Sequence, residues 1–124
     1  MKLRIKGNSL RLRVSCSEVA RLIQKGLLQE TIQFAREDNA KLTYALELSA
    51  VAMMLRYRPQ GIAFTLPNLE ARQWFQSDQV GLYREVGVGN ETLAMAVEKD
   101  FACLDGSEAE SEDAYENPNR GKSC

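Results

Sequence analysis

Basic side chains alternate with other residues in two short runs near the N-terminus, with Lys2, Arg4 and Lys6 in the first and Arg11 and Arg13 in the second. Residues two apart lie on the same face of a β-strand, so each run would place its cations on one face. A guanidinium group presents parallel N–H donors that match the oxygens of a phosphate or carboxylate. The sequence therefore predicts an anion-binding face made by Lys2, Arg4, Arg11 and Arg13.

The two runs are joined by Gly7-Asn8, which tolerates the positive φ angles of a tight hairpin turn. In that hairpin Arg4 lies opposite Arg11, and Lys2 lies opposite Arg13. Like charges directly opposite one another destabilise a strand pair. Three explanations stay open: carboxylates from other strands neutralise the cations, a bound anion does so, or the face is solvated and its charges are screened.

Glu47, Glu98 and Asp100 are the candidate carboxylate partners, because each lies on the less apolar face of its predicted strand. Glu98 and Asp100 are two residues apart and could alternatively hold a hard cation such as Mg²⁺. The cysteines, Cys16, Cys103 and Cys124, show no C-x-x-C spacing, and the chain has no histidine. No catalytic residues, metal site or cofactor are therefore predicted, and whether the chain is an enzyme stays open.

Composition indicates a globular protein, with 44% hydrophobic and 27% charged residues in 124. We expect residues 1–104 to form a single domain and residues 105–124, which are rich in Asp, Glu, Ser and Gly, to be a flexible acidic tail. The small basic excess of the body argues against nucleic acid as a partner, and no apolar run is long enough for a membrane span. The odd cysteine count without an export signal predicts a cytoplasmic protein.

Helical periodicity appears twice. Ser15 and Glu18 have the spacing of a capping box, which predicts a helix over residues 16–25 that ends before Gly26. A second short helix is expected to begin at Asn68 as N-cap and to carry the only tryptophan, Trp74. About eight short strands surround these helices, so the predicted class is α+β, with a mainly antiparallel curled or barrel-like sheet. We find no convincing internal repeat.

Several segments resemble an uncharacterised family of short bacterial proteins, a domain of unknown function. The resemblance covers nearly the whole chain and is strongest in MKLRIKGNSLRLRV at the N-terminus, LTYALE (Leu42 to Glu47), SDQVGL (Ser77 to Leu82), VEKDFACLD (Val97 to Asp105) and EDAYENPN (Glu112 to Asn119). It implies a bacterial stand-alone domain and implies no activity.

A weaker resemblance is to the triphosphate-tunnel enzymes, which are closed antiparallel barrels lined with Arg, Lys and Glu. SLRLRV (Ser9 to Val14) and KLTYAL (Lys41 to Leu46) are similar to strands of that family. The first strand of the family alternates Glu, Glu and Lys, whereas the present chain has Lys2, Arg4 and Lys6. The resemblance implies a metal-dependent reaction on triphosphates, for which the metal-binding glutamates are missing from this strand.

The leading hypothesis for function is a non-catalytic binding or interaction module with a phosphate or carboxylate ligand on the basic face. The alternative is a metal-dependent phosphohydrolase in which Glu47, Glu98 and Asp100 bind metal or act as a base. A third hypothesis is a protein–protein adaptor that binds its partner through an exposed Trp74 or through the acidic tail.

Overall fold

The computed structural model describes residues 1–101, which form eight strands and two helices. The predicted α+β class, with about eight strands and two short helices, is confirmed. In chain order the elements are β1 (Lys2–Lys6), β2 (Ser9–Val14), α1 (Cys16–Lys25), β3 (Leu27–Gln33), β4 (Lys41–Ser49), β5 (Met54–Arg58), β6 (Gly61–Pro67), α2 (Asn68–Gln76), β7 (Gly81–Val88) and β8 (Glu91–Lys99).

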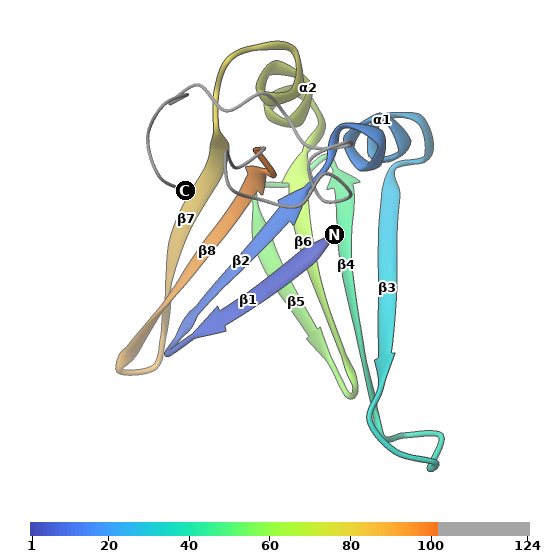
Figure 1. The fold of residues 1–124 in the computed structure, drawn as a ribbon. Coiled ribbons are helices and arrows are strands. Elements are labelled where there is room, and N and C mark those ends of the chain that lie inside the picture. The colour runs from blue at the N-terminus through green and yellow to red at the C-terminus, as the bar shows by residue number, and fades with distance from the viewer. Residues whose placement is uncertain (102–124) are drawn as a thin grey trace. The chain divides into compact units, whose positions relative to one another are not determined.

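The strands form two four-stranded sheets (Figure 1). Sheet A has the order β1-β2-β8-β7, and sheet B has the order β3-β4-β6-β5. In both sheets the central pair is parallel and each outer strand is antiparallel to its neighbour, so most pairings are antiparallel, as predicted. Within residues 1–101 each sheet keeps two open edges, so the described strands form no closed barrel and a curled sheet is the nearer prediction.

The described chain divides into two compact units. The first contains residues 1–19 and the chain from Val80 onward, which includes all of sheet A. The second is Ala20–Gln79 and contains sheet B and α2. The acidic tail predicted for residues 105–124 lies outside the described residues, and the single domain predicted for residues 1–104 stays a prediction.

The N-terminal hairpin has the predicted register. Arg4 pairs with Arg11 and Lys2 pairs with Arg13. Gly7 has a φ of 55°, which the missing Cβ permits, so the turn tightens at the residue expected. Alternation along β1 and β2 therefore separates a basic face from an apolar face, on which Leu12 and Val14 are buried.

The first helix is also formed as predicted. The backbone N–H of Ser15 donates to Glu18 Oε1 over 2.9 Å, and the N–H of Glu18 donates to Ser15 Oγ over 3.4 Å, which together make the capping box. The helix ends at Lys25, and the next residue, Gly26, has a φ of 78° and donates its N–H to Leu22 O. Local sequence therefore determines both ends of α1.

The predicted start of the second helix was wrong by one residue. Pro67 is the N-cap of α2, and Asn68 is the first helical residue. The Asn68 side chain donates to Ser49 O instead of capping the helix, so an interaction from β4 replaces the local one. Neither helix of the described chain has the length and apolar composition needed to cross a membrane.

Sheet B is packed by α2, which contacts β4 and β6. Trp74 and Ala71 of this helix are fully buried, as are Phe64, Leu66 and Leu46 of the sheet. A fully buried indole cannot present its ring to a partner. The adaptor hypothesis is therefore wrong in its first form, through an exposed Trp74, and its second form, through the acidic tail, lies outside the described residues.

The two halves of the chain repeat one arrangement. Each half reads strand, strand, helix, strand, strand, first from β1 to β4 and then from β5 to β8. Exchanging β1 with β5, β2 with β6, β3 with β7 and β4 with β8 converts the strand order of sheet A into that of sheet B. Each sheet therefore joins one hairpin from each half.

The two halves also share their strand registers and a backbone hydrogen bond beside each hairpin turn. Leu3 pairs with Leu12 as Leu55 pairs with Phe64. In addition, the N–H of Ala94 donates to Asn8 O, and at the corresponding place the N–H of Thr43 donates to Gln60 O. The structure therefore repeats its pairing geometry, although the sequence shows no convincing internal repeat.

Candidate anion-binding site

The four residues predicted to bind an anion lie on one face of sheet A. Alternation along β1 places Lys2 and Arg4 on this face, and the register sets Arg13 and Arg11 opposite them. Lys6 lies on the same face, opposite Ser9. Sheet A thus concentrates positive charge on one side, and the cross-strand pairs Arg4–Arg11 and Lys2–Arg13 both repel.

Glu98 is the carboxylate at the centre of this face. It lies on β8 beside Arg13, and its side chain is only 13% exposed. Its Oε1 lies 3.0 Å from Arg11 Nε and 3.8 Å from Arg13 Nε. Its Oε2 accepts a 2.6 Å hydrogen bond from the Tyr83 hydroxyl. One carboxylate therefore forms ion pairs with two guanidinium groups and accepts a hydrogen bond from a phenol.

The other predicted carboxylates have separate partners. Asp100 Oδ2 lies 2.9 Å from Lys2 Nζ, so it forms an ion pair with the first cation of β1. Glu47 lies on β4 in sheet B and accepts a 3.1 Å hydrogen bond from Arg56 Nη1. Glu98 and Asp100 thus lie beside the predicted basic residues, whereas Glu47 lies on the other sheet.

Arg11 combines attraction with poor hydrogen-bond geometry. Its Nε is buried and has no hydrogen-bond partner within the described chain, although Glu98 Oε1 is 3.0 Å away. The contact is close enough for charge attraction, but its direction does not satisfy the N–H donor. Directional donors are the usual means by which arginine binds an oxyanion.

No carboxylate of residues 1–101 lies within ion-pair distance of Arg4 or Lys6, and both side chains are exposed. They line a hollow of about 450 Å³. Residues on the same face that complete it include Ser9, Arg11, Tyr83 and Glu85. Glu85 is the one carboxylate among the lining residues, and it lies within ion-pair distance of neither Arg4 nor Lys6, so the lining carries an excess of positive charge.

Sequence reasoning missed Tyr83 and Gly81. Gly81 lies opposite Glu98, and a Cβ at this position would come within 2.5 Å of Val97 O, 2.8 Å of Glu98 Cγ and 3.1 Å of the Tyr83 hydroxyl oxygen. The missing side chain leaves room for Tyr83 to reach Glu98. A glycine two residues before a tyrosine on the same strand face was the available signal, but only the strand register shows its meaning.

We expect Gly81→Ala to destabilise the protein by about 1–3 kcal/mol, because its methyl group would overlap backbone that cannot withdraw. Gly87→Ala on the same strand is the matched control, since a Cβ there meets nothing within 4 Å. It should change the free energy of unfolding by less than about 1 kcal/mol. Urea denaturation of both variants measures the difference, and equal losses would contradict this account of Gly81.

Burial of the hydroxyl end and the hydrogen bond to Glu98 raise the pKa of Tyr83 to about 12 from its usual 10. The residue as a whole is 59% exposed, and its hydroxyl donates to the largely buried Glu98. The folded state thus favours the protonated phenol. The stabilisation is complete below about pH 10 and is lost as the pH rises through about 12.

Ultraviolet titration of tyrosinate should therefore show one tyrosine that ionises late. Tyr83→Phe should remove that late step, whereas Tyr57→Phe, the control at another exposed tyrosine, should leave it in place. A late step that persists in Tyr83→Phe would show that another residue causes it.

Comparison with known proteins adds one finding. A family model described as "Family of unknown function (DUF7009)" matches residues 1–119. No curated protein and no solved structure matches the chain. The match covers most of the 124 residues, including both halves of the repeat and the basic face of sheet A. The chain therefore belongs to DUF7009, a family of unknown function.

Proposed function

We propose that the protein is a non-catalytic, cytoplasmic binding module that holds a phosphate- or carboxylate-bearing ligand on sheet A. The observation that carries the proposal is the pair of exposed cations, Arg4 and Lys6, that line one hollow without a carboxylate partner in residues 1–101. Arg11 at the same hollow adds a third positive charge, which Glu98 neutralises only in part.

Electrostatics favours an anion in this hollow. Arg4 and Arg11 lie directly opposite one another, so their charges oppose the pairing of β1 with β2. An oxyanion between them would replace this repulsion with charge-assisted hydrogen bonds of about 1.5–3 kcal/mol each. Two such bonds correspond to a dissociation constant near the millimolar range. Tighter binding requires a ligand with further groups, for which about 450 Å³ leaves space.

Binding without catalysis is favoured by the way the carboxylates are engaged. Glu98 is held by Arg11, Arg13 and Tyr83, so it is poorly placed to accept a proton from substrate. Within the described part of the chain, no three side chains of the metal-binding types come together. The phosphohydrolase alternative thus gains no specific support and becomes an outcome of the test.

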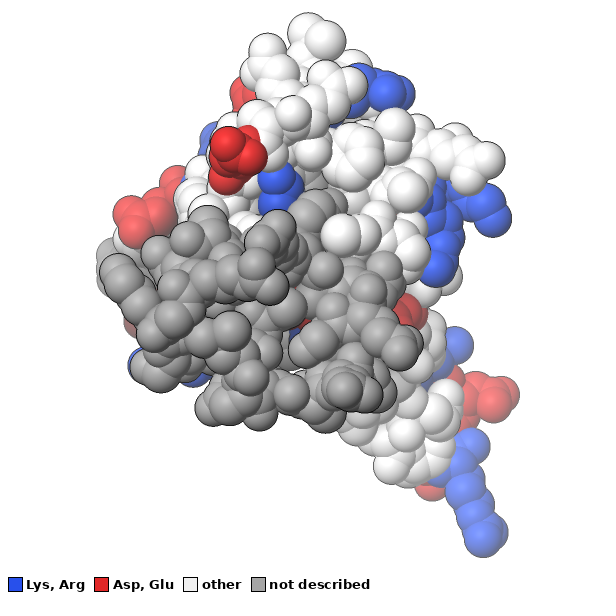
Figure 2. All heavy atoms as spheres, turned by 45° about the horizontal axis from the view of Figure 1, so that its top comes forward, with Lys and Arg blue, Asp and Glu red and all other residues white. Residues whose placement is uncertain are grey.

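The size of the hollow supports a small ligand. Its volume of about 450 Å³ suits a ligand with one or a few anionic groups. Figure 2 shows Lys, Arg, Asp and Glu atoms exposed on one face of the structure.

We expect phosphate, tripolyphosphate or a simple dicarboxylate to raise the thermal unfolding temperature of the full chain at constant ionic strength. A ligand present at 100 times its dissociation constant stabilises the native state by about 2.7 kcal/mol. Arg4→Gln combined with Lys6→Gln should abolish most of this shift. The variant removes the two cations that have no ion-pair partner in residues 1–101 and keeps polar side chains of similar length.

The matched control is Arg21→Gln combined with Arg72→Gln, which removes the same charge from exposed helix positions. This control should keep the shift. No shift with any of these anions, or the same reduction in both double variants, would overturn the sheet A proposal. Release of inorganic phosphate from tripolyphosphate with Mg²⁺, lost in Glu98→Gln, would establish the hydrolase alternative instead.

A further inference from the structure

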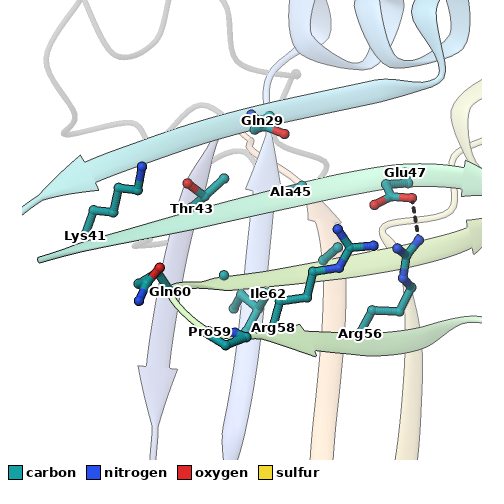
Figure 3. Close-up of a pocket in the computed structure, with 12 residues that line it drawn as sticks. Gln29, Lys41, Thr43, Ala45, Glu47, Arg56, Arg58, Pro59, Gln60 and Ile62 are labelled. Carbon is teal, nitrogen blue, oxygen red and sulfur yellow. Dashed lines mark hydrogen bonds and ion pairs between the residues drawn. The ribbon is translucent and has the colours of Figure 1, made fainter. Parts of the chain in front are cut away.

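A second charged hollow lies on sheet B. Arg56 and Arg58 of β5 and Glu47 of β4 lie on one face of that sheet, together with Thr43 and Lys41. These residues line a hollow of about 240 Å³. Figure 3 shows that the side chains of Arg56 and Arg58 both extend from β5 across β6 toward β4.

Charge in this hollow is unbalanced. Glu47 is the one carboxylate among the residues that line it, and it is engaged by Arg56 Nη1 at 3.1 Å. Within residues 1–101 no carboxylate lies within ion-pair distance of Arg58 or Lys41. The dashed contact in Figure 3 accordingly joins only Arg56 to Glu47. Two positive charges remain, at different points of the hollow.

The internal repeat relates this hollow to the one on sheet A. Arg56 occupies the position of Arg4, and Arg58 occupies the position of Lys6, in strands with the same register. Glu47 likewise occupies the position of Glu98, because both face the second strand of the adjoining hairpin. The two hollows thus share a pair of cations on the edge strand and a glutamate on the central strand.

Differences between the hollows affect the size of ligand that each can take. Ala63 replaces Arg11, so sheet B lacks the cation that engages the glutamate in sheet A, and Arg56 takes that role. Gln29 stands where sheet A has Tyr83. The sheet B hollow is about half as large and retains amide donors, which suits one small oxyanion.

Gln60 adds a strained backbone to this hollow. It has a φ of 61° and is the one non-glycine residue with positive φ in the described chain. Glycine or asparagine ordinarily occupies this position after proline in a turn, and strain of this kind costs about 1–3 kcal/mol. In this conformation Gln60 O accepts a 2.8 Å hydrogen bond from the Thr43 N–H. The Gln60 side chain is among those that line the hollow (Figure 3).

We infer that sheet B contains a second anion-binding site, which takes a single oxyanion of about phosphate size at Arg58, with Lys41 and the Gln60 amide contributing from other points of the same hollow (Figure 3). The site goes beyond the one proposed on sheet A and depends on different residues. A chain with both would bind two anions, one on each sheet.

The experiment is an amide-resolved NMR titration of the full chain with inorganic phosphate at constant ionic strength. Gly61 and Thr43 report on sheet B, and the corresponding Ser9 and Ala94 report on sheet A, because they occupy equivalent positions beside the two turns. A parallel titration with succinate distinguishes a phosphate ligand from a carboxylate ligand.

Lys41→Gln combined with Arg58→Gln should weaken phosphate binding at the sheet B reporters at least tenfold and leave the sheet A reporters unchanged. The control variant, Arg21→Gln combined with Arg72→Gln, should alter neither. Dispersion of the amide spectrum confirms that each variant is folded. Gln60→Gly provides a second test: it should raise thermal stability by relieving strain while it weakens phosphate binding at sheet B.

Failure of this inference is distinguishable from failure of the sheet A proposal. Movement of the Ser9 and Ala94 signals alone would overturn the second site and keep the first. Movement of the Gly61 and Thr43 signals alone would do the reverse. Sheet B shifts that survive unchanged in the Lys41, Arg58 variant, or shifts with succinate and none with phosphate, would also overturn the inference.

Discussion

On each sheet, one glutamate lies on a face that carries more positive charge than it can neutralise. In sheet A, Glu98 attracts Arg11 and Arg13, which would otherwise repel the opposed cations of β1. Its side chain is largely buried, whereas those of Arg11 and Arg13 are 39% and 44% exposed, so salt can still screen the attraction. The equivalent Glu47 holds Arg56 on sheet B. Cations beyond these pairs remain at the edge strands, and the two hollows follow from that imbalance.

The repeat explains why the imbalance occurs twice. The parallel pairs β2–β8 and β4–β6 each join strands from different halves, so neither half can complete a sheet from its own strands. Edge hairpins then carry the basic residues, and the strand from the other half carries the glutamate. The two halves differ more in their side chains than in their pairing. A slip of one residue in register would turn the buried side chains of a strand to the wrong face.

Features that depend on neighbouring residues were predictable from the sequence. The β1–β2 hairpin and the capping box of α1 each need only a few consecutive residues, and both were predicted correctly. The start of α2 was misplaced because Asn68 bonds to Ser49 on another element. Parallel pairing, the Tyr83–Glu98 bond and the repeat require contacts between distant segments, for which alternation of side chains carries no information.

The most direct test of this account is the stability of Glu98→Gln as a function of salt, with exposed Glu91→Gln as the control of equal charge. Glutamine keeps an acceptor for Tyr83 and removes only the charge. We expect Glu98→Gln to lose about 2 kcal/mol at about 0.01 M salt and to recover much of it near 1 M, where the Debye length falls to about 3 Å. Glu91→Gln should change little at either concentration. A loss for Glu98→Gln that is independent of salt would contradict the claim that this carboxylate holds opposed cations together.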